Sequence, residues 1–146
     1  MIFSQLMFRT INIKLALLFF PVILVSCAKN PVSGYDFVTI TEQQEIEMGR
    51  AYHKEIINNA KILDNKELNK YYVELGEKIA KSSHRPDLDW KFTIIDDPTM
   101  NAFATPGGYV YFYRGLLVHF NSEAEFAGVL SHEIAHITAR HAVRGM

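Results

Sequence analysis

Residues 41–83 show two stretches in which apolar and small residues recur at helical spacing. Thr41 and Gln44 form a capping-box pattern, and the steps of three and four residues that follow predict a helix over about 42–59. Asp64 with Glu67 opens a second helix, which is predicted to end near Ser83, before Arg85-Pro86. Its apolar stripe consists of Leu68, Tyr72, Leu75 and Ile79.

The pattern changes to alternation between residues 90 and 113. Trp90 to Ile95 is rich in β-formers and is stopped by Asp96-Asp97-Pro98. Short strands are predicted at 102–104 and 109–113, separated by the turn residues 105–108. The aromatic run 109–113 is expected to pack against its neighbours, and a ligand platform is the alternative.

A third helix is predicted over about 123–142, opened by a second capping box of Ser122 and Glu125. Its Phe126, Leu130, Ile134 and Ile137 share one face. Two helices, a small sheet and a third helix predict an α+β fold. No internal repeat is visible.

The first 26 residues have the pattern of an export signal. Arg9 and Lys14 precede an uncharged run of eleven residues, which is too short to span a bilayer comfortably. Met7 is an alternative start, because both features lie after it. The run ends in Leu24-Val25-Ser26-Cys27, which resembles a bacterial lipobox and makes Cys27 the candidate lipidation site. Residues 27–40 are interpreted as a tether, and an uncleaved anchor or a buried core segment is the alternative for the apolar run.

Composition narrows the function classes further. The chain is 49% hydrophobic and 21% charged with a formal net charge of -1, which is typical of a globular protein. Because the charge is near neutral, binding to nucleic acid through phosphate contacts is not expected. A single cysteine excludes a disulfide scaffold and a cysteine-cluster metal site.

The candidate chemistry lies in His132-Glu133-Ile134-Ala135-His136 on the third helix. Two histidines four residues apart sit on one helical face, where both imidazoles can reach one Zn²⁺. Glu133 beside them is the candidate general base for a peptidase. Histidines that make only structural contacts are the alternative.

A catalytic zinc site needs a third protein ligand, and none is convincing within the chain. On a continuous helix His141 faces away from His132, and Glu125 lies about 10 Å along the axis from it. The spacing after His136 lacks the glycine and histidine of the metzincin pattern. We therefore expect the third ligand beyond residue 146. His53, His84 and His119 have no ligating spacing and are assigned no role.

The stretch 132–141, together with 101–111 and Arg114-Gly-Leu-Leu117, resembles the CAAX-prenyl-protease family of zinc metallopeptidases. The exported bacterial lipoprotein branch fits best, including its Asn-Pro-Val-x-Gly stretch at 30–34. The resemblance implies a zincin-like (gluzincin) domain, of which residues 41–146 are the amino-terminal part, incomplete at its carboxyl end. It also implies a third ligand from a glutamate on a later helix, and a substrate-binding role for Asn101, which as a turn residue is equally explicable.

These features predict a zinc metalloendopeptidase that cleaves cell-envelope proteins in protein quality control. Its partners are protein or peptide substrates and, through the lipid anchor, a membrane. The resemblance to bacterial lipoproteins, with Ala28 after the cysteine, implies the periplasmic side of the outer membrane; a soluble periplasmic or inner-membrane-anchored form is the alternative. The alternative function is a lipid-anchored binding or chaperone-like module that keeps the metal helix and does not cleave. For want of the third ligand, the 146-residue chain alone is expected to be inactive.

Overall fold

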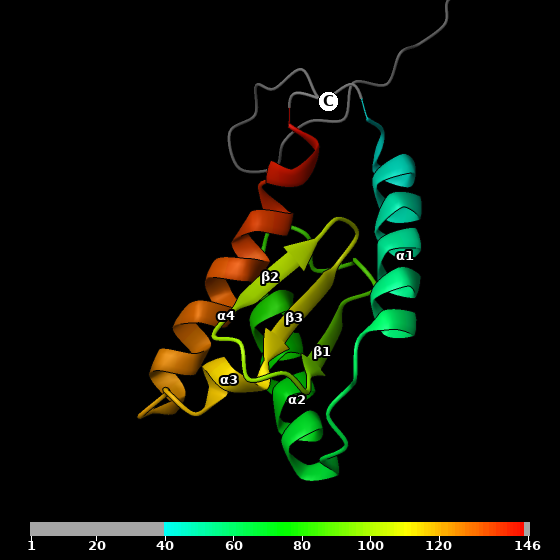
Figure 1. The fold of residues 1–146 in the computed structure, drawn as a ribbon. Helices are drawn as coiled ribbons and strands as arrows, with labels where there is room; N and C mark the ends of the chain where they lie inside the picture. The colour runs from blue at the N-terminus through cyan, green and yellow to red at the C-terminus, as the bar shows by residue number, and fades with distance from the viewer. Residues whose placement is uncertain (1–39, 145–146) are drawn as a thin grey trace, which may run out of the picture.

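The computed structural model describes residues 40–144, which form the expected α+β fold of helices around a small sheet (Figure 1). The helices and strands follow one another as α1 (Glu42–Asn59), α2 (Lys66–Lys81), β1 (Lys91–Ile95), β2 (Ala102–Thr105), β3 (Tyr109–Tyr113), α3 (Arg114–Leu117), α4 (Glu123–Thr138) and a 3₁₀ turn (His141–Val143). None of the helices within residues 40–144 combines the length and hydropathy needed to cross a membrane. The predicted signal peptide (1–26) lies outside this range. So does the predicted tether (27–40), including Cys27 and excepting Ile40.

The sheet has the strand order β1-β3-β2. β1 pairs with β3 in parallel, and β2 pairs with β3 antiparallel, with Ala104 opposite Val110. The turn from β2 to β3 places Gly107 at φ 80° and Gly108 at φ 104°, a region that side-chain-bearing residues avoid. In the strand order β1-β3-β2, the strand β2 lies at one edge of the sheet, and it lies beside α4 (Figure 1).

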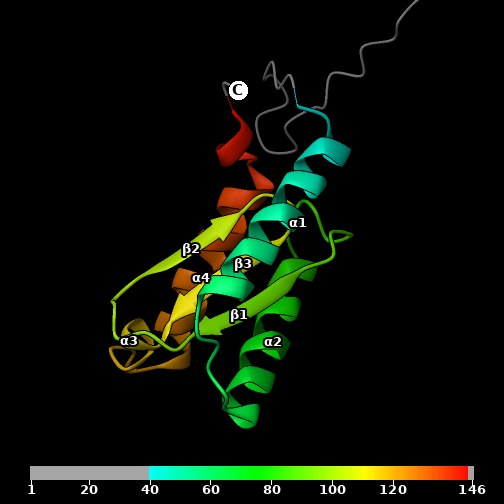
Figure 2. The same cartoon turned by 45° about the vertical axis from the view of Figure 1, so that its right-hand side comes forward.

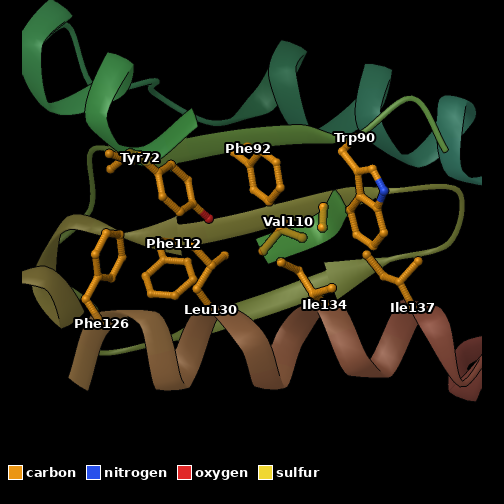
Figure 3. Close-up of a cluster of buried hydrophobic side chains, with 11 residues drawn as sticks. Tyr72, Trp90, Phe92, Val110, Phe112, Phe126, Leu130, Ile134 and Ile137 are labelled. Carbon is orange, nitrogen blue, oxygen red and sulfur yellow. The ribbon is translucent and has the colours of Figure 1, made fainter. Parts of the chain in front are cut away.

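The two faces of the sheet are covered by different helices. α2 and α4 pack on one face through a cluster that includes Tyr72, Phe112 and Leu130 (Figure 3). α1 covers the other face (Figure 2). Tyr109 and Tyr111 of β3 lie on that face, in a cluster with Ile56 of α1. Alternate residues of β3 thus point to opposite faces, as the pleat of a strand requires. The aromatic run at 109–113 is packing, as expected, because four of its five residues are buried.

The helix starts follow local capping chemistry. Thr41 and Gln44 make both hydrogen bonds of a capping box, and Ser122 accepts from the backbone N–H of Glu125. The start of α2 lies one residue later than predicted, because Asn65 rather than Asp64 accepts from the N–H of Leu68 and caps the helix. Asn65 itself has an extended backbone, as is usual for an N-cap, so the helix begins at Lys66.

The end of α4 differs from the prediction. The helix ends at Thr138 rather than near residue 142, and Arg140 takes a left-handed conformation with φ 57° and ψ 34°. The backbone changes direction there and continues as a 3₁₀ turn from His141. Neither glycine nor proline marks this position, so the local sequence gave no stop signal.

Candidate metal centre and adjoining cleft

His132 and His136 lie one turn apart on α4, on the side that faces away from the core. Phe126, Leu130, Ile134 and Ile137 are buried against the sheet and fix the rotation of the helix (Figure 3). The Nε2 atoms of the two histidines are 3.0 Å apart, and their rings stand at 89° to each other. The structure therefore brings together the two histidines that the motif predicted as a pair.

The two imidazoles fit a shared metal ion. Two nitrogens bound tetrahedrally to one zinc at about 2.0–2.1 Å lie about 3.4 Å apart, close to the separation found here. Both side chains reach solvent, so an ion has access to them. A divalent cation binds through the lone pairs of both Nε2 atoms, so it would take the place of the proton that the two nitrogens share at 3.0 Å.

A cleft of about 460 Å³ opens beside this pair, between β2 and the end of α4. The half-buried Glu133 lines it together with His136, on the side opposite the edge strand. The residues of β2 and its turn that line it are Ala102, Phe103, Ala104, Thr105 and Pro106. An acid beside two potential metal ligands, in a cleft bordered by a strand edge, suits the binding of an extended peptide.

The charge of Glu133 is felt in the core. The Tyr72 hydroxyl is buried without a hydrogen-bond partner among the residues that the structure describes. Burial raises the pKa of Tyr72 well above its usual value, and the charge of Glu133 raises it further. The Tyr72 hydroxyl therefore stays protonated and neutral near neutral pH.

The prediction that His141 faces away from the histidine pair is wrong. Because the helix ends at Thr138 and the chain turns at Arg140, the ring of His141 returns to that of His136. Their Nδ1 atoms are 2.7 Å apart. His141 approaches the edge of the His136 ring that carries Nδ1, whereas His132 faces its Nε2.

A buried carboxylate, Glu45, was missed by the sequence reasoning. It is 1% exposed, and its two oxygens accept from Arg85 and Arg140, each at 2.7 Å. Burial lowers the pKa of Arg85, but hydrogen bonds and charges from Glu45 and Glu42 outweigh it and raise the pKa overall. The signal was present, because Glu45 precedes Gly49 and His53 at four-residue steps on the face of α1 toward the sheet.

The other candidate residues lie apart from the histidine pair. Asn101 is exposed before β2, where its carbonyl accepts from the N–H of Tyr113, and it does not line the cleft. Glu125 accepts from the N–H of Asn121 at the start of α4. His53 is on the opposite face of the sheet, and His84 and His119 are exposed. Within residues 40–144, no group of three histidine, cysteine, aspartate or glutamate side chains is arranged to hold a metal.

The fold and this site define a class of protein. Residues 66–146 match the profile of peptidase family M48, and the chain belongs to that family. M48 is a family of metallopeptidases, so membership implies a divalent metal. Within the described residues, His132 and His136 are the pair that fits such an ion.

Proteins similar to this chain include bacterial proteases and mitochondrial metalloendopeptidases. A Vibrio cholerae protein provisionally named a beta-barrel assembly-enhancing protease is 41% identical over 108 residues, which cover 74% of this chain and 22% of the relative. The Escherichia coli beta-barrel assembly-enhancing protease is 31% identical over the same shares. The mitochondrial metalloendopeptidase OMA1 of Arabidopsis thaliana is 35% identical over 58% of this chain and 18% of its own length. The chain thus spans about a fifth of these relatives.

Proposed function

We propose that this chain carries the metal-binding helix and the substrate strand of a zinc-dependent metalloendopeptidase that cleaves proteins of the cell envelope. The observation that carries the proposal is the convergence of the Nε2 atoms of His132 and His136 beside Glu133, at a cleft bordered by an edge strand. Histidines with only structural roles would not need to converge on solvent.

His132 and His136 would hold the ion through Nε2. A bound zinc ion supplies Lewis-acid chemistry, polarising the peptide carbonyl and making water a better nucleophile near neutral pH. The Glu133 carboxylate accepts the proton of the attacking water and then delivers it to the nitrogen of the leaving amine. Its half-buried place in the cleft strengthens its interaction with positive charge.

The substrate backbone is proposed to add to the free edge of β2. One edge of β2 pairs with β3, and among the described strands none pairs with the other edge. An extended peptide there would run alongside α4, with its backbone held by Ala102–Thr105. Such binding selects for extended or unfolded segments, which suits a protease that removes misfolded proteins.

The third zinc ligand is proposed to lie outside residues 40–144. The resemblance to the CAAX-prenyl-protease family implies a glutamate on a later helix. Two protein ligands leave the ion weakly held, which supports the proposal that the 146-residue chain alone is inactive.

A location in the envelope is supported by the pattern at the amino terminus and by the names of the bacterial relatives. The export signal at 1–26 and the lipobox at Cys27 would place the domain on the periplasmic side of the outer membrane. The relatives named beta-barrel assembly-enhancing proteases suggest substrates among envelope proteins.

The proposal is tested with Glu133→Gln in a version of the protein that extends past residue 146. The variant is expected to bind zinc as the parent does and to lose casein cleavage by a factor of about 10² or more. Glu77→Gln, an exposed position on α2, is the matched control and should retain activity. Casein cleavage by the Glu133 variant at the rate of the parent would show that Glu133 is not the general base. A parent that binds zinc without cleaving would favour the non-cleaving binding module.

A further inference from the structure

The chain beyond α4 is held in an unusual backbone conformation. Arg140, one residue past the helix cap, has φ 57°, a region in which glycine is the usual residue at a helix end. The turn it makes sends the backbone back toward the helix and begins the 3₁₀ segment at His141. Something other than local preference must therefore hold this turn.

The holding contacts come from Glu45 on α1, from Ile40 just before this helix, and from Arg85. The guanidinium of Arg140 is 3% exposed; its Nε donates to Glu45 Oε2 at 2.7 Å and its Nη2 donates to the carbonyl of Ile40 at 2.8 Å. The other oxygen of Glu45 accepts from Arg85 Nη1, which also donates to the carbonyl of Ile137 at 3.3 Å. One buried carboxylate thus fixes the last turn of α4 and the residue after it.

This arrangement delivers His141 to His136. The Nδ1 atoms of the two rings are 2.7 Å apart, while the Nε2 of His136 faces the Nε2 of His132 at 3.0 Å. His136 is therefore contacted at both ring nitrogens. A short Nδ1–Nδ1 contact between neutral rings requires a proton on one nitrogen and a lone pair on the other.

We propose that His141 is a positioning residue for His136: its Nδ1 accepts a hydrogen bond from Nδ1–H of His136 and so leaves Nε2 of His136 unprotonated and aimed toward His132. The Arg140–Glu45 ion pair keeps His141 in place. The inference rests on the proposed function in that it takes His136 as a metal ligand. A hydrogen bond to the far nitrogen fixes the tautomer and the ring orientation of a ligating histidine.

His141 as a third ligand is the competing interpretation, and the geometry is against it. The described residues contain no group of three side chains placed to hold a metal. His141 meets the Nδ1 edge of the His136 ring, whereas the paired Nε2 atoms converge at the other edge. A third metal ligand would have to reach the edge of the His136 ring that carries Nε2.

The first test reads the tautomer of His136 in the metal-free chain, at a pH at which the imidazoles are neutral. Long-range ¹H–¹⁵N spectra distinguish protonated from unprotonated ring nitrogens. We expect Nδ1–H at His136 in the parent and in His141→Asn, whose side-chain oxygen lies near the position of Nδ1. His141→Phe should release His136 toward the Nε2–H form that free imidazoles prefer. Nε2–H in the parent, or an unchanged tautomer in His141→Phe, would overturn the inference.

The second test measures zinc affinity by competition with a chromophoric chelator, in the version of the protein that extends past residue 146. We expect a loss of about 10- to 100-fold in His141→Phe and recovery in His141→Asn, because removal of a partner of a ligating histidine has effects of that size. Arg140→Gly, which relieves the backbone but removes the ion pair, should also weaken binding. His119→Phe, at an exposed position on the loop before α4, is the matched control.

The two tests separate the failure of this inference from that of the proposed function. Absence of zinc binding in a parent that shows the Nδ1–H tautomer would count against His136 as a ligand while supporting its contact with His141. Equal zinc affinity in the parent, His141→Phe and Arg140→Gly would overturn the positioning role while leaving the metal site intact. Because His141 is exposed, its variants are expected to fold, and circular dichroism checks that they do.

Discussion

Gly49 of α1 lies directly against the backbone of Pro106 in the turn after β2. A Cβ atom added at Gly49 would lie 1.8 Å from the carbonyl oxygen of Pro106, far inside any allowed contact. Thr105 and Pro106 line the cleft beside Glu133. The absence of a side chain at one position of α1 therefore sets how closely this helix approaches the wall of the cleft.

Gly49→Ala is expected to destabilise the protein despite the better helix propensity of alanine. The clash is with backbone, so α1 or the turn must move, and we expect a loss of about 2 kcal/mol or more in the free energy of unfolding. Gly128→Ala in α4 is the matched control, because nothing lies within 4 Å of its Cβ, and it should stabilise by about 0.5–1 kcal/mol. Urea unfolding measures both; equal effects would show that the approach of α1 is not tight.

Glu45→Ala is expected to be among the most damaging single substitutions on α1. It leaves Arg85 and Arg140, 8% and 3% exposed, without the carboxylate that both contact. Removing one partner of a buried ion pair costs about 3–5 kcal/mol. Glu47→Ala, an exposed position on the same helix, should change stability by no more than about 0.5 kcal/mol. Chemical denaturation measures the loss of unfolding free energy in both variants. A small loss in Glu45→Ala as well as in Glu47→Ala would show that the ion cluster around Glu45 is solvated and not buried.

Local chemistry made most of this fold predictable, and long-range contacts explain what was not. The start of α1 and the strand at 109–113 follow from capping residues and alternation that lie within a few positions of each other. The end of α4 depends on Arg140 reaching Glu45, 95 positions away. A helical projection that assumes a continuous helix therefore put His141 on the wrong side, whereas His132 and His136, inside the regular part, were paired correctly.

The stability of the fold should fall in mild acid through His53. Its Nδ1 lies 2.8 Å from the Tyr111 hydroxyl, and its ring stacks on Tyr109 at 4.5 Å. Burial, followed by the charge of Lys91, lowers the pKa of His53 below 6.5, whereas burial raises that of Tyr111 to about 12. The unfolded chain thus takes up the proton first as the pH falls.

The stability that neutral His53 contributes is fully present above the unfolded pKa of 6.5 and is lost as the pH falls through the lower folded value. His53→Gln removes this proton uptake. The difference in unfolding free energy between parent and variant should therefore shrink between pH 7.5 and pH 5, as followed by denaturant unfolding at each pH. A difference that stays constant with pH would show that His53 titrates equally in both states.

Cys27→Ser tests the proposed anchor, which lies outside the described residues. The lipobox pattern Leu24 to Cys27 requires the cysteine thiol as the acylated group, so the serine variant should incorporate no palmitate and should remain as the uncut precursor. Metabolic labelling and the mobility of the protein on a gel read out both effects. Ser26→Ala, which keeps a small residue before the cysteine, is the control and should be processed. Normal labelling of Cys27→Ser would contradict the lipoprotein proposal.

Residues 27–146 on their own are expected to bind zinc weakly and to cleave no peptide. His132 and His136 fill two of the three protein positions of a catalytic zinc, and the described residues offer no third. Water would complete the coordination, and the ion would contribute less to folding than it does in a complete site. Zinc titration of this chain against a version extended through the next helix measures the difference, with His136→Ala in each as the control for specific binding. Equal, tight one-to-one affinity in both versions would mean that a third ligand lies within the present sequence.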